Sequence, residues 1–170
     1  MNSVIEEAYS LLRTATPLHK DCGRLCGRRC CKGEETDGMW LFPGEEERFA
    51  AWRREGEESF TVRPTQDNLG YPLLVCDGTC NRERRPLACR MYPLFPLVEG
   101  LPGQERIRLL YDPRGRGICP LAAGQLPLEF TFRRAVRRAA RVLLRDPKCA
   151  DYLRQTGAFL QEILELQHRL

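Results

Sequence analysis

Apolar residues recur at helical spacing in two stretches of the N-terminal half of the chain. The first stretch, residues 3–16, predicts a helix, and Ser3 with Glu6 fits a capping box that would begin it. The second stretch, 43–55, has acids in its first turn and arginines in its last, an order that the helix dipole favours. The apolar positions are Ile5, Ala8, Leu11 and Leu12 in the first helix and Phe49 and Trp52 in the second.

Two longer amphipathic helices are predicted near the C-terminal end. Residues 127–146 are apolar on one side and rich in arginine on the other, and Pro147 begins a last helix that runs to about residue 168. Cys149 lies alone in the first turn of that last helix, and we interpret it as a packed thiol rather than a metal ligand. The apolar positions are Phe132, Val136, Ala139, Ala140 and Leu143, then Tyr152, Phe159, Leu160, Ile163 and Leu164.

Short strands are predicted between these helices. Residues 59–65 and 71–76 are rich in strand-forming side chains and flank a turn, and 105–112 predicts a third strand. The segment from Cys76 to Pro96 is rich in proline and glycine, so we expect no regular structure there.

The pattern predicts an α+β, α-dominated fold with a short β element. We expect one domain, 1–170, in which 20–120 is a cysteine-rich metal-binding region and 127–168 a C-terminal helical pair. Long irregular loops are uncommon in a compact domain unless something holds them together, and a bound metal would do so.

Cysteine usage and charge narrow the class of protein. The chain has nine cysteines and no basic, apolar signal sequence at its N-terminus, so we expect a cytoplasmic protein whose cysteines bind metal rather than form disulfides. No apolar run is long enough for a membrane span. The formal charge of +4 counts every cysteine as neutral. It would largely disappear if the clustered cysteines were metal-bound thiolates.

Eight of the cysteines lie in the irregular region. The stretch "CGRLCGRRCC" places four of them within ten positions, beside several basic residues, which is hard to reconcile with a role as buried apolar side chains. Structural zinc ions and iron–sulfur clusters are usually bound by four thiolates per centre. The candidate metal ligands are Cys22, Cys26, Cys30, Cys31, Cys76, Cys80, Cys89 and Cys119.

These motifs resemble a bacterial family. "CGRLCGRRCC" followed by "RRPLACRMYPLFP" is similar to the CxxCxxCC proteins, a zinc- or iron-chelating family also called YkgJ-like. The similarity covers about residues 20–120, and it implies chelation by the first seven candidate cysteines, with Cys119 matching a later cysteine that such proteins often have. Related domains occur in proteins implicated in flagellin lysine methylation, which implies protein modification as one possible role.

The chain departs from the family at two points. The gaps between its first cysteines are three residues where the family has two, and Asn81 and Arg82 replace the Ile-Tyr pair of the family. Zinc sites favour C-x2-C, which is absent, and adjacent Cys30 and Cys31 suit a larger centre better than one small ion. We therefore favour an iron–sulfur cluster over zinc, with both left open.

Two arginines beside the cysteines can interact with a bound cofactor. Arg85 and Arg90 would offset thiolate charge and donate hydrogen bonds to sulfur, as cofactor-binding residues. His19 precedes Cys22 by three residues, but a lone histidine is more often solvated than a ligand. The arginine stripe of the 127–146 helix is interpreted as a solvated face, so nucleic-acid binding is not favoured.

No catalytic motif identifies an enzyme class, because phosphate-binding loops, dinucleotide fingerprints and nucleophile elbows are all absent. Three hypotheses follow. The metal is a redox or substrate-binding centre of an enzyme or its accessory protein, acting on a protein partner or protein substrate. Alternatively, it is a structural zinc in a protein-interaction module, or, less favoured, the arginine helix binds nucleic acid.

Overall fold

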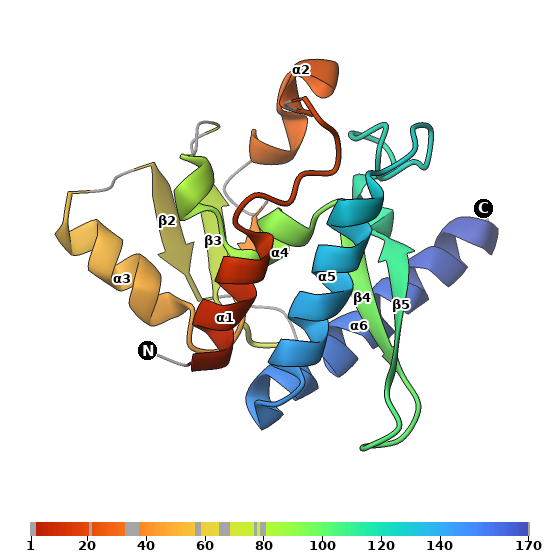
Figure 1. Cartoon of the computed structure of the whole chain (residues 1–170). Coiled ribbons are helices and arrows are strands. Elements are labelled where there is room, and N and C mark those ends of the chain that lie inside the picture. The colour runs from red at the N-terminus through yellow and green to blue at the C-terminus, as the bar shows by residue number, and fades with distance from the viewer. Residues whose placement is uncertain are drawn as a thin grey trace.

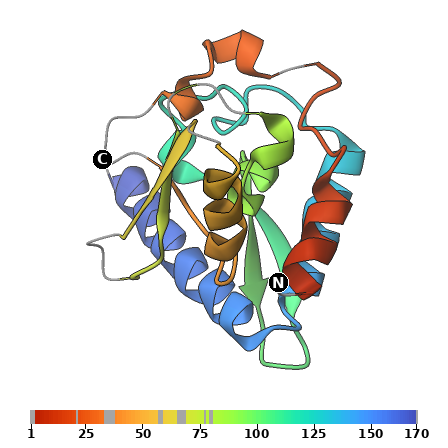
Figure 2. The ribbon, with the colours of Figure 1, turned by 90° about the vertical axis from the view of Figure 1, so that its left-hand side faces the viewer.

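Figure 1 shows the computed structural model, which describes residues 3–20, 22–32, 38–56, 59–64, 69–76, 78 and 81–169. Its centre is an antiparallel hairpin of β4 (Leu94–Glu99) and β5 (Arg106–Tyr111), with Leu94 opposite Tyr111. Helix α5 (Phe130–Leu143) packs on one face of the hairpin, and α6 (Pro147–Arg169) packs on the other (Figures 1 and 2). Helix α1 (Ser3–Leu12) lies alongside α5.

Complementary apolar stripes hold α1 against α5. Ile5 and Ala8 of α1 and Phe132 and Val136 of α5 are spaced three or four residues apart, so each pair lies on one side of its helix. All four side chains are buried in the main core. Burial of one such large apolar side chain is worth about 1.5–3 kcal/mol, so this contact is a major source of stability.

Gly157 allows α6 to lie close to the hairpin. A Cβ atom at this position would lie 3.0 Å from Leu97 Cδ2 and 3.5 Å from Phe95 Cε1. Glycine inside a helix costs about 1 kcal/mol relative to alanine. Here the close approach of β4 explains its presence.

A three-stranded sheet and one helix enclose a second, smaller core. The strands β1 (Met39–Trp40), β3 (Leu73–Cys76) and β2 (Phe60–Arg63) form an antiparallel sheet in that order. Helix α3 (Glu46–Arg54) packs beside it, and Leu41, Phe49, Phe60 and Leu74 fill the space between them. The other short elements are α2 (Gly23–Cys26), η1 (Arg29–Cys31), η2 (Arg82–Arg84), α4 (Leu87–Met91) and η3 (Pro113–Gly115).

The α+β, α-dominated fold and the two C-terminal helices are confirmed. The strands expected at 59–65, 71–76 and 105–112 are confirmed as β2, β3 and β5. The last residue of the first of these, 65, and part of the following turn, 66–68, lie outside the described residues. In the described part of the chain, no helix combines the length and apolar character that a bilayer crossing requires.

The expectation of no regular structure between Cys76 and Pro96 is wrong. That segment contains η2 and α4, and β4 begins at Leu94. Pro96 is tolerated because, among the described strands, β4 pairs with β5 alone, so one edge of β4 needs no backbone donor. Glu6, the expected capping-box partner of Ser3, accepts a hydrogen bond from Arg48 Nη1.

A buried carboxylate joins three of these elements. Glu45 is 0 % exposed, and its Oε1 atom accepts hydrogen bonds from the Tyr9 hydroxyl at 2.5 Å and the Leu87 amide at 2.9 Å. Its Oε2 atom accepts from the Phe42 amide at 2.8 Å. The Arg48 guanidinium lies 4.2 Å from the centre of the Tyr9 ring. Glu45 therefore links α1, the turn before α3 and the N-terminus of α4.

Replacing Glu45 with glutamine should destabilise the fold by about 2 kcal/mol, because the amide has one acceptor oxygen for three donors and leaves a buried donor unsatisfied. Denaturant unfolding at pH 5, where the advantage of the wild type should be large, measures the change. Glu47→Gln is the matched control, since Glu47 is exposed on α3 and should change stability by less than about 0.5 kcal/mol. Equal stabilities of the two variants would contradict the role assigned to Glu45.

Stability should also depend on pH through Glu45. Burial raises the pKa of this carboxyl to about 7 from its ordinary value of 4.5. Between these values the folded chain binds a proton that the unfolded chain does not, so stability falls as pH rises across the window. The advantage of the wild type over Glu45→Gln should therefore be greatest near pH 4.5 and smallest above pH 7. An advantage that grows from pH 5 to pH 8 would contradict this assignment.

Candidate metal centre

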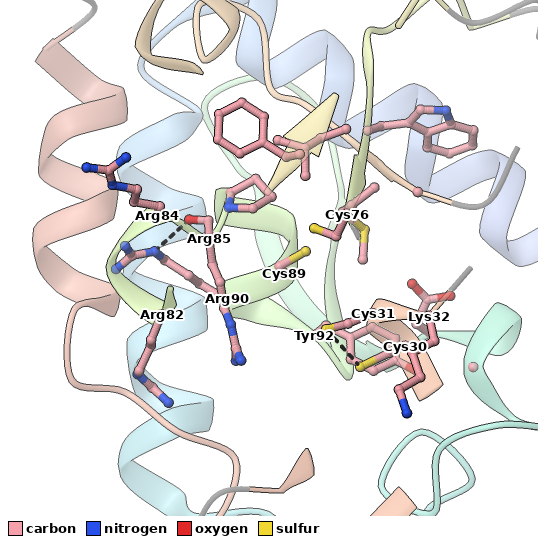
Figure 3. Close-up of a pocket in the computed structure, with 18 of the residues that line it drawn as sticks. Cys30, Cys31, Lys32, Cys76, Arg82, Arg84, Arg85, Cys89, Arg90 and Tyr92 are labelled. Atoms are coloured by element: carbon pink, nitrogen blue, oxygen red, sulfur yellow. Dashed lines mark hydrogen bonds between the residues drawn. The ribbon is translucent and has the colours of Figure 1, made fainter. Parts of the chain in front are cut away.

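Cysteines from separate parts of the chain line one cavity of about 1060 Å³. In Figure 3 the sulfur atoms of Cys76 and Cys89 face the same hollow as those of Cys30 and Cys31. The cavity thus brings together cysteines that lie up to 67 positions apart in the sequence. The cysteines of the cavity wall are Cys22, Cys30, Cys31, Cys76 and Cys89.

A left-handed turn positions the adjacent pair. Gly27 and Arg28 have φ values of 61° and 59°, so the chain reverses between α2 and η1. Glycine adopts this conformation at little cost, whereas Arg28 adopts it against the usual preference of a side chain with Cβ. The turn leads directly into η1, which carries Cys30 and Cys31 to the cavity.

Cys76 and Cys89 are held by regular structure. Cys76 is the last residue of β3 and pairs with Phe60 of β2. In α4, Leu87 and Met91 are four residues apart and buried in the core. Cys89 lies midway between them in sequence, so it projects from the opposite side of the helix towards the cavity.

The thiols line the wall without forming a closed site. The Sγ atoms of Cys30 and Cys31 are 3.9 Å apart. Counting only described residues, no group of three or more His, Cys, Asp or Glu side chains lies close enough together to hold a metal ion. A centre built from the described thiols alone would therefore require their sulfur atoms to move closer.

The remaining candidate ligands lie elsewhere. Cys119 is buried in a small cluster with Leu121 and Ala122, against which Cys22 packs. Cys26 ends α2 and is absent from the cavity lining, while Cys80 lies outside the described residues.

Two further residues have environments that do not favour ligation. Cys149 is 0 % exposed, and its Sγ lies 3.8 Å from the Pro43 carbonyl oxygen, consistent with the packed thiol that we predicted. The His19 side chain is 87 % exposed, and its Nε2 lies 3.1 Å from Glu129 Oε2.

The arginines of the second cysteine segment form part of the cavity wall. Arg90 donates from Nε to the Arg85 carbonyl at 2.9 Å and from Nη2 to the Glu83 carbonyl at 2.6 Å. Arg82 donates from Nη2 to the Ala15 carbonyl at 2.9 Å. These bonds fix the guanidinium groups in place on backbone oxygens. The proposed hydrogen bonds from Arg85 and Arg90 to sulfur stay a prediction.

The Tyr92 hydroxyl is a buried polar group at the cavity. No hydrogen-bond partner is found for it among the described residues. Burial and the nearby Cys119 thiol raise the pKa of Tyr92, so the phenol stays protonated at neutral pH. A Cβ at Gly115 would lie 2.0 Å from this hydroxyl, so only glycine leaves room for it. The hydroxyl therefore lies packed beside Gly115 and near the Cys119 thiol, out of reach of solvent.

Sequence reasoning missed Glu45 and the pair of Asp112 and Arg114. Glu45 stands among acids at the start of a helix, where a solvated carboxylate is typical, and nothing in the pattern marks it as buried. Asp112 accepts two hydrogen bonds from the Arg114 guanidinium, at 3.0 and 2.6 Å, inside the cavity wall. The spacing Asp-Pro-Arg was the available signal, because it places the two side chains on one short turn.

Comparison with known proteins gives no match. No family model, no curated protein and no solved structure matches the chain. The resemblance to the CxxCxxCC proteins therefore rests on the motifs alone.

The rates at which the thiols react should distinguish the cavity cysteines from the packed Cys149. Burial raises the pKa of Cys149 to about 12, so about one thiol in 10⁴ is ionised at pH 8. In protein freed of metal, we expect Cys149 to be the slowest described cysteine to react with iodoacetamide and the exposed Cys30 to be among the fastest. Peptide mass spectrometry of a time course measures this, with urea-unfolded protein as the control in which all sites react. Alkylation of both cysteines at similar rates in the folded chain would contradict the assignment.

Proposed function

We propose that the chain is a metal-binding protein of the CxxCxxCC kind, which holds an iron–sulfur cluster or zinc with clustered cysteine thiolates. The observation that carries the proposal is the gathering of five cysteines from four chain segments on one cavity. Cysteines used as small apolar side chains would be buried, as Cys149 is. The five cavity cysteines are half-buried or exposed instead.

The donor set fits such a centre. Cys30, Cys31, Cys76 and Cys89 face the same hollow and would supply four thiolates, the number that zinc or a cluster requires. Cys22 lies on the same wall as a possible fifth donor. The volume of the cavity exceeds what one ion needs, which supports the larger cluster over zinc.

The surrounding residues would serve the centre in distinct ways. The Tyr92 side chain would form part of the wall around the centre. Arg90 and Arg85 would offset the negative charge of the thiolates. A bound cluster would supply electron transfer or a Lewis-acidic iron, whereas zinc would supply a structural link or a Lewis acid.

The proposal also includes the cellular compartment and the kind of partner. We propose a cytoplasmic location, the compartment expected from the cysteine usage of the sequence. We propose a protein partner or protein substrate, in keeping with the protein-modification role that the family resemblance implies. A structural zinc in a protein-interaction module is the alternative, and metal identity distinguishes it.

Metal content tests the proposal directly. The chain, purified without oxygen, should contain stoichiometric metal, with iron, acid-labile sulfide and a brown colour for a cluster, or zinc and no colour for the alternative. Cys89→Ala should lose most of this metal because it removes a ligand. Cys149→Ala is the matched control, since it makes the same substitution at a thiol outside the cavity and should retain the metal.

Elemental analysis and absorption spectra on the same samples give the result, and circular dichroism establishes that both variants are folded. Wild-type protein without stoichiometric metal would overturn the proposal. Equal metal in both variants would overturn the assignment of Cys89 as a ligand.

A further inference from the structure

We infer that the arginine face of α5 is a docking site for an acidic segment of a partner protein, in which Asp or Glu side chains recur along one side. This inference deepens the proposed function, because it gives the chemistry of the protein partner proposed above, but it needs no metal. None of the arginines concerned lines the cysteine cavity. The arginine face consists of Arg133, Arg134, Arg137, Arg138 and Arg141 of α5 and Arg145, which follows the helix.

The centre of the arginine face points away from the core. Arg134, Arg138 and Arg141 are spaced four and three residues apart, so they form one row on the side of α5 opposite its buried residues. All three are exposed, and at 1.5 Å per residue the row is about 10 Å long. Figure 1 shows α5 on the outside of the molecule, with the hairpin behind it and α1 beside it. The row is therefore accessible to a partner.

The arginine face has little counter-charge of its own. Helix α5 contains no acidic residue, and Arg145 forms an ion pair with Glu7 of α1. Within the described part of the chain, no ion pair or hydrogen bond is found for the other five guanidinium groups. Like charges three and four residues apart on a helix repel one another and oppose its formation. The face is therefore kept at some expense of stability.

The other long helices carry charges of both signs. Helix α3 has two glutamates and three arginines, and α6 has three acidic and three basic side chains besides His168. Helix α5 has five arginines and no acid. Solvation, the role that the sequence favours for this stripe, is achieved as well by mixed charges. A requirement for a single sign of charge points to a partner of the opposite sign.

Carboxylates are the groups that this face is suited to bind. One end of it already does so, because the Arg145 guanidinium donates a hydrogen bond to a carboxylate oxygen of Glu7. A guanidinium can form two parallel hydrogen bonds with a carboxylate, which makes the pairing specific in geometry as well as in charge. Acidic side chains repeated along one side of a partner segment would extend this pairing from Arg145 along the row.

The geometry favours a protein segment over nucleic acid or a lipid surface. Helix α1, which lies beside α5, has two glutamates and no basic residue, so the positive surface does not extend over it to meet a wide phosphate backbone. No aromatic side chain stands between the arginines to stack on a base. The apolar side of α5 is buried in the core and cannot enter a membrane. A narrow row of this kind fits one acidic segment.

The test uses two labelled helical peptides of about 15 residues. One has glutamates at the four- and three-residue spacing of the arginine row, and the other has glutamines at the same positions. Fluorescence anisotropy at an ionic strength of about 0.1 M measures their binding to the full chain, purified without oxygen and analysed for metal. We expect saturable binding of the glutamate peptide and binding of the glutamine peptide at least about 10-fold weaker.

Two double variants locate the site. Arg138→Glu with Arg141→Glu reverses two charges of the row, and Arg54→Glu with Arg169→Glu reverses two exposed charges on α3 and α6. The first pair should weaken binding of the glutamate peptide at least about 10-fold and the second less than about 2-fold. Melting curves should show the first variant to be at least as stable as the wild type, because repulsion between neighbouring arginines is relieved. A face that is only solvated would give the same stability without the loss of binding.

The outcomes separate this inference from the proposed function. If a metal-loaded chain does not bind the glutamate peptide saturably, or binds both peptides equally, the docking site is overturned and metal binding is left intact. Equal weakening by the two double variants also overturns it, because the effect would then be one of net charge. Tighter binding of a DNA duplex of about 15 base pairs, lost in the first variant, assigns the face to nucleic acid and overturns the protein partner. Peptide binding by a chain without metal, weakened only by the first pair, supports the docking site and overturns the metal proposal.

Discussion

The buried carboxylate of Glu45 is the constraint on which the arrangement of the candidate site depends. It accepts hydrogen bonds from α1 through Tyr9, from the turn before α3 through Phe42 and from the first amide of α4 through Leu87. Helix α4 has only five residues, too few to be stable alone, so its position comes from this contact and from the burial of Leu87 and Met91. Because α4 carries Cys89 and Arg90, one carboxylate in the core determines where two site residues lie.

The predictable part of the fold is the part in which spacing alone decides the structure. Helix α5 has five apolar residues on one side and arginines on the other, and no other arrangement buries the first set and solvates the second. In contrast, β4 contains Pro96, which argues against a strand unless one edge is left unpaired. Whether β4 has an unpaired edge depends on which strands it pairs with, and in the described structure its partner is β5. The local sequence does not contain that information.

The candidate site, too, could be predicted from the sequence only in part. The cysteine motifs pointed to the segments that meet at the cavity, because thiols beside basic residues are poorly suited to a core. The sequence did not distinguish Cys89, on the cavity, from Cys119, packed against Leu121 and Ala122, since both follow loop residues. Nor did it indicate that Arg90 would bond to the carbonyls of its own segment, which requires the chain to turn back at η2.

The size of the cavity bears on the choice between a structural metal and a centre that acts on a ligand. A structural zinc site is closed by four protein ligands, and it needs no open volume around it. Here the cysteines share a cavity of about 1060 Å³ with aromatic and basic side chains. For the metal centre that we propose, this open volume favours a role on a bound molecule over a role that only links loops.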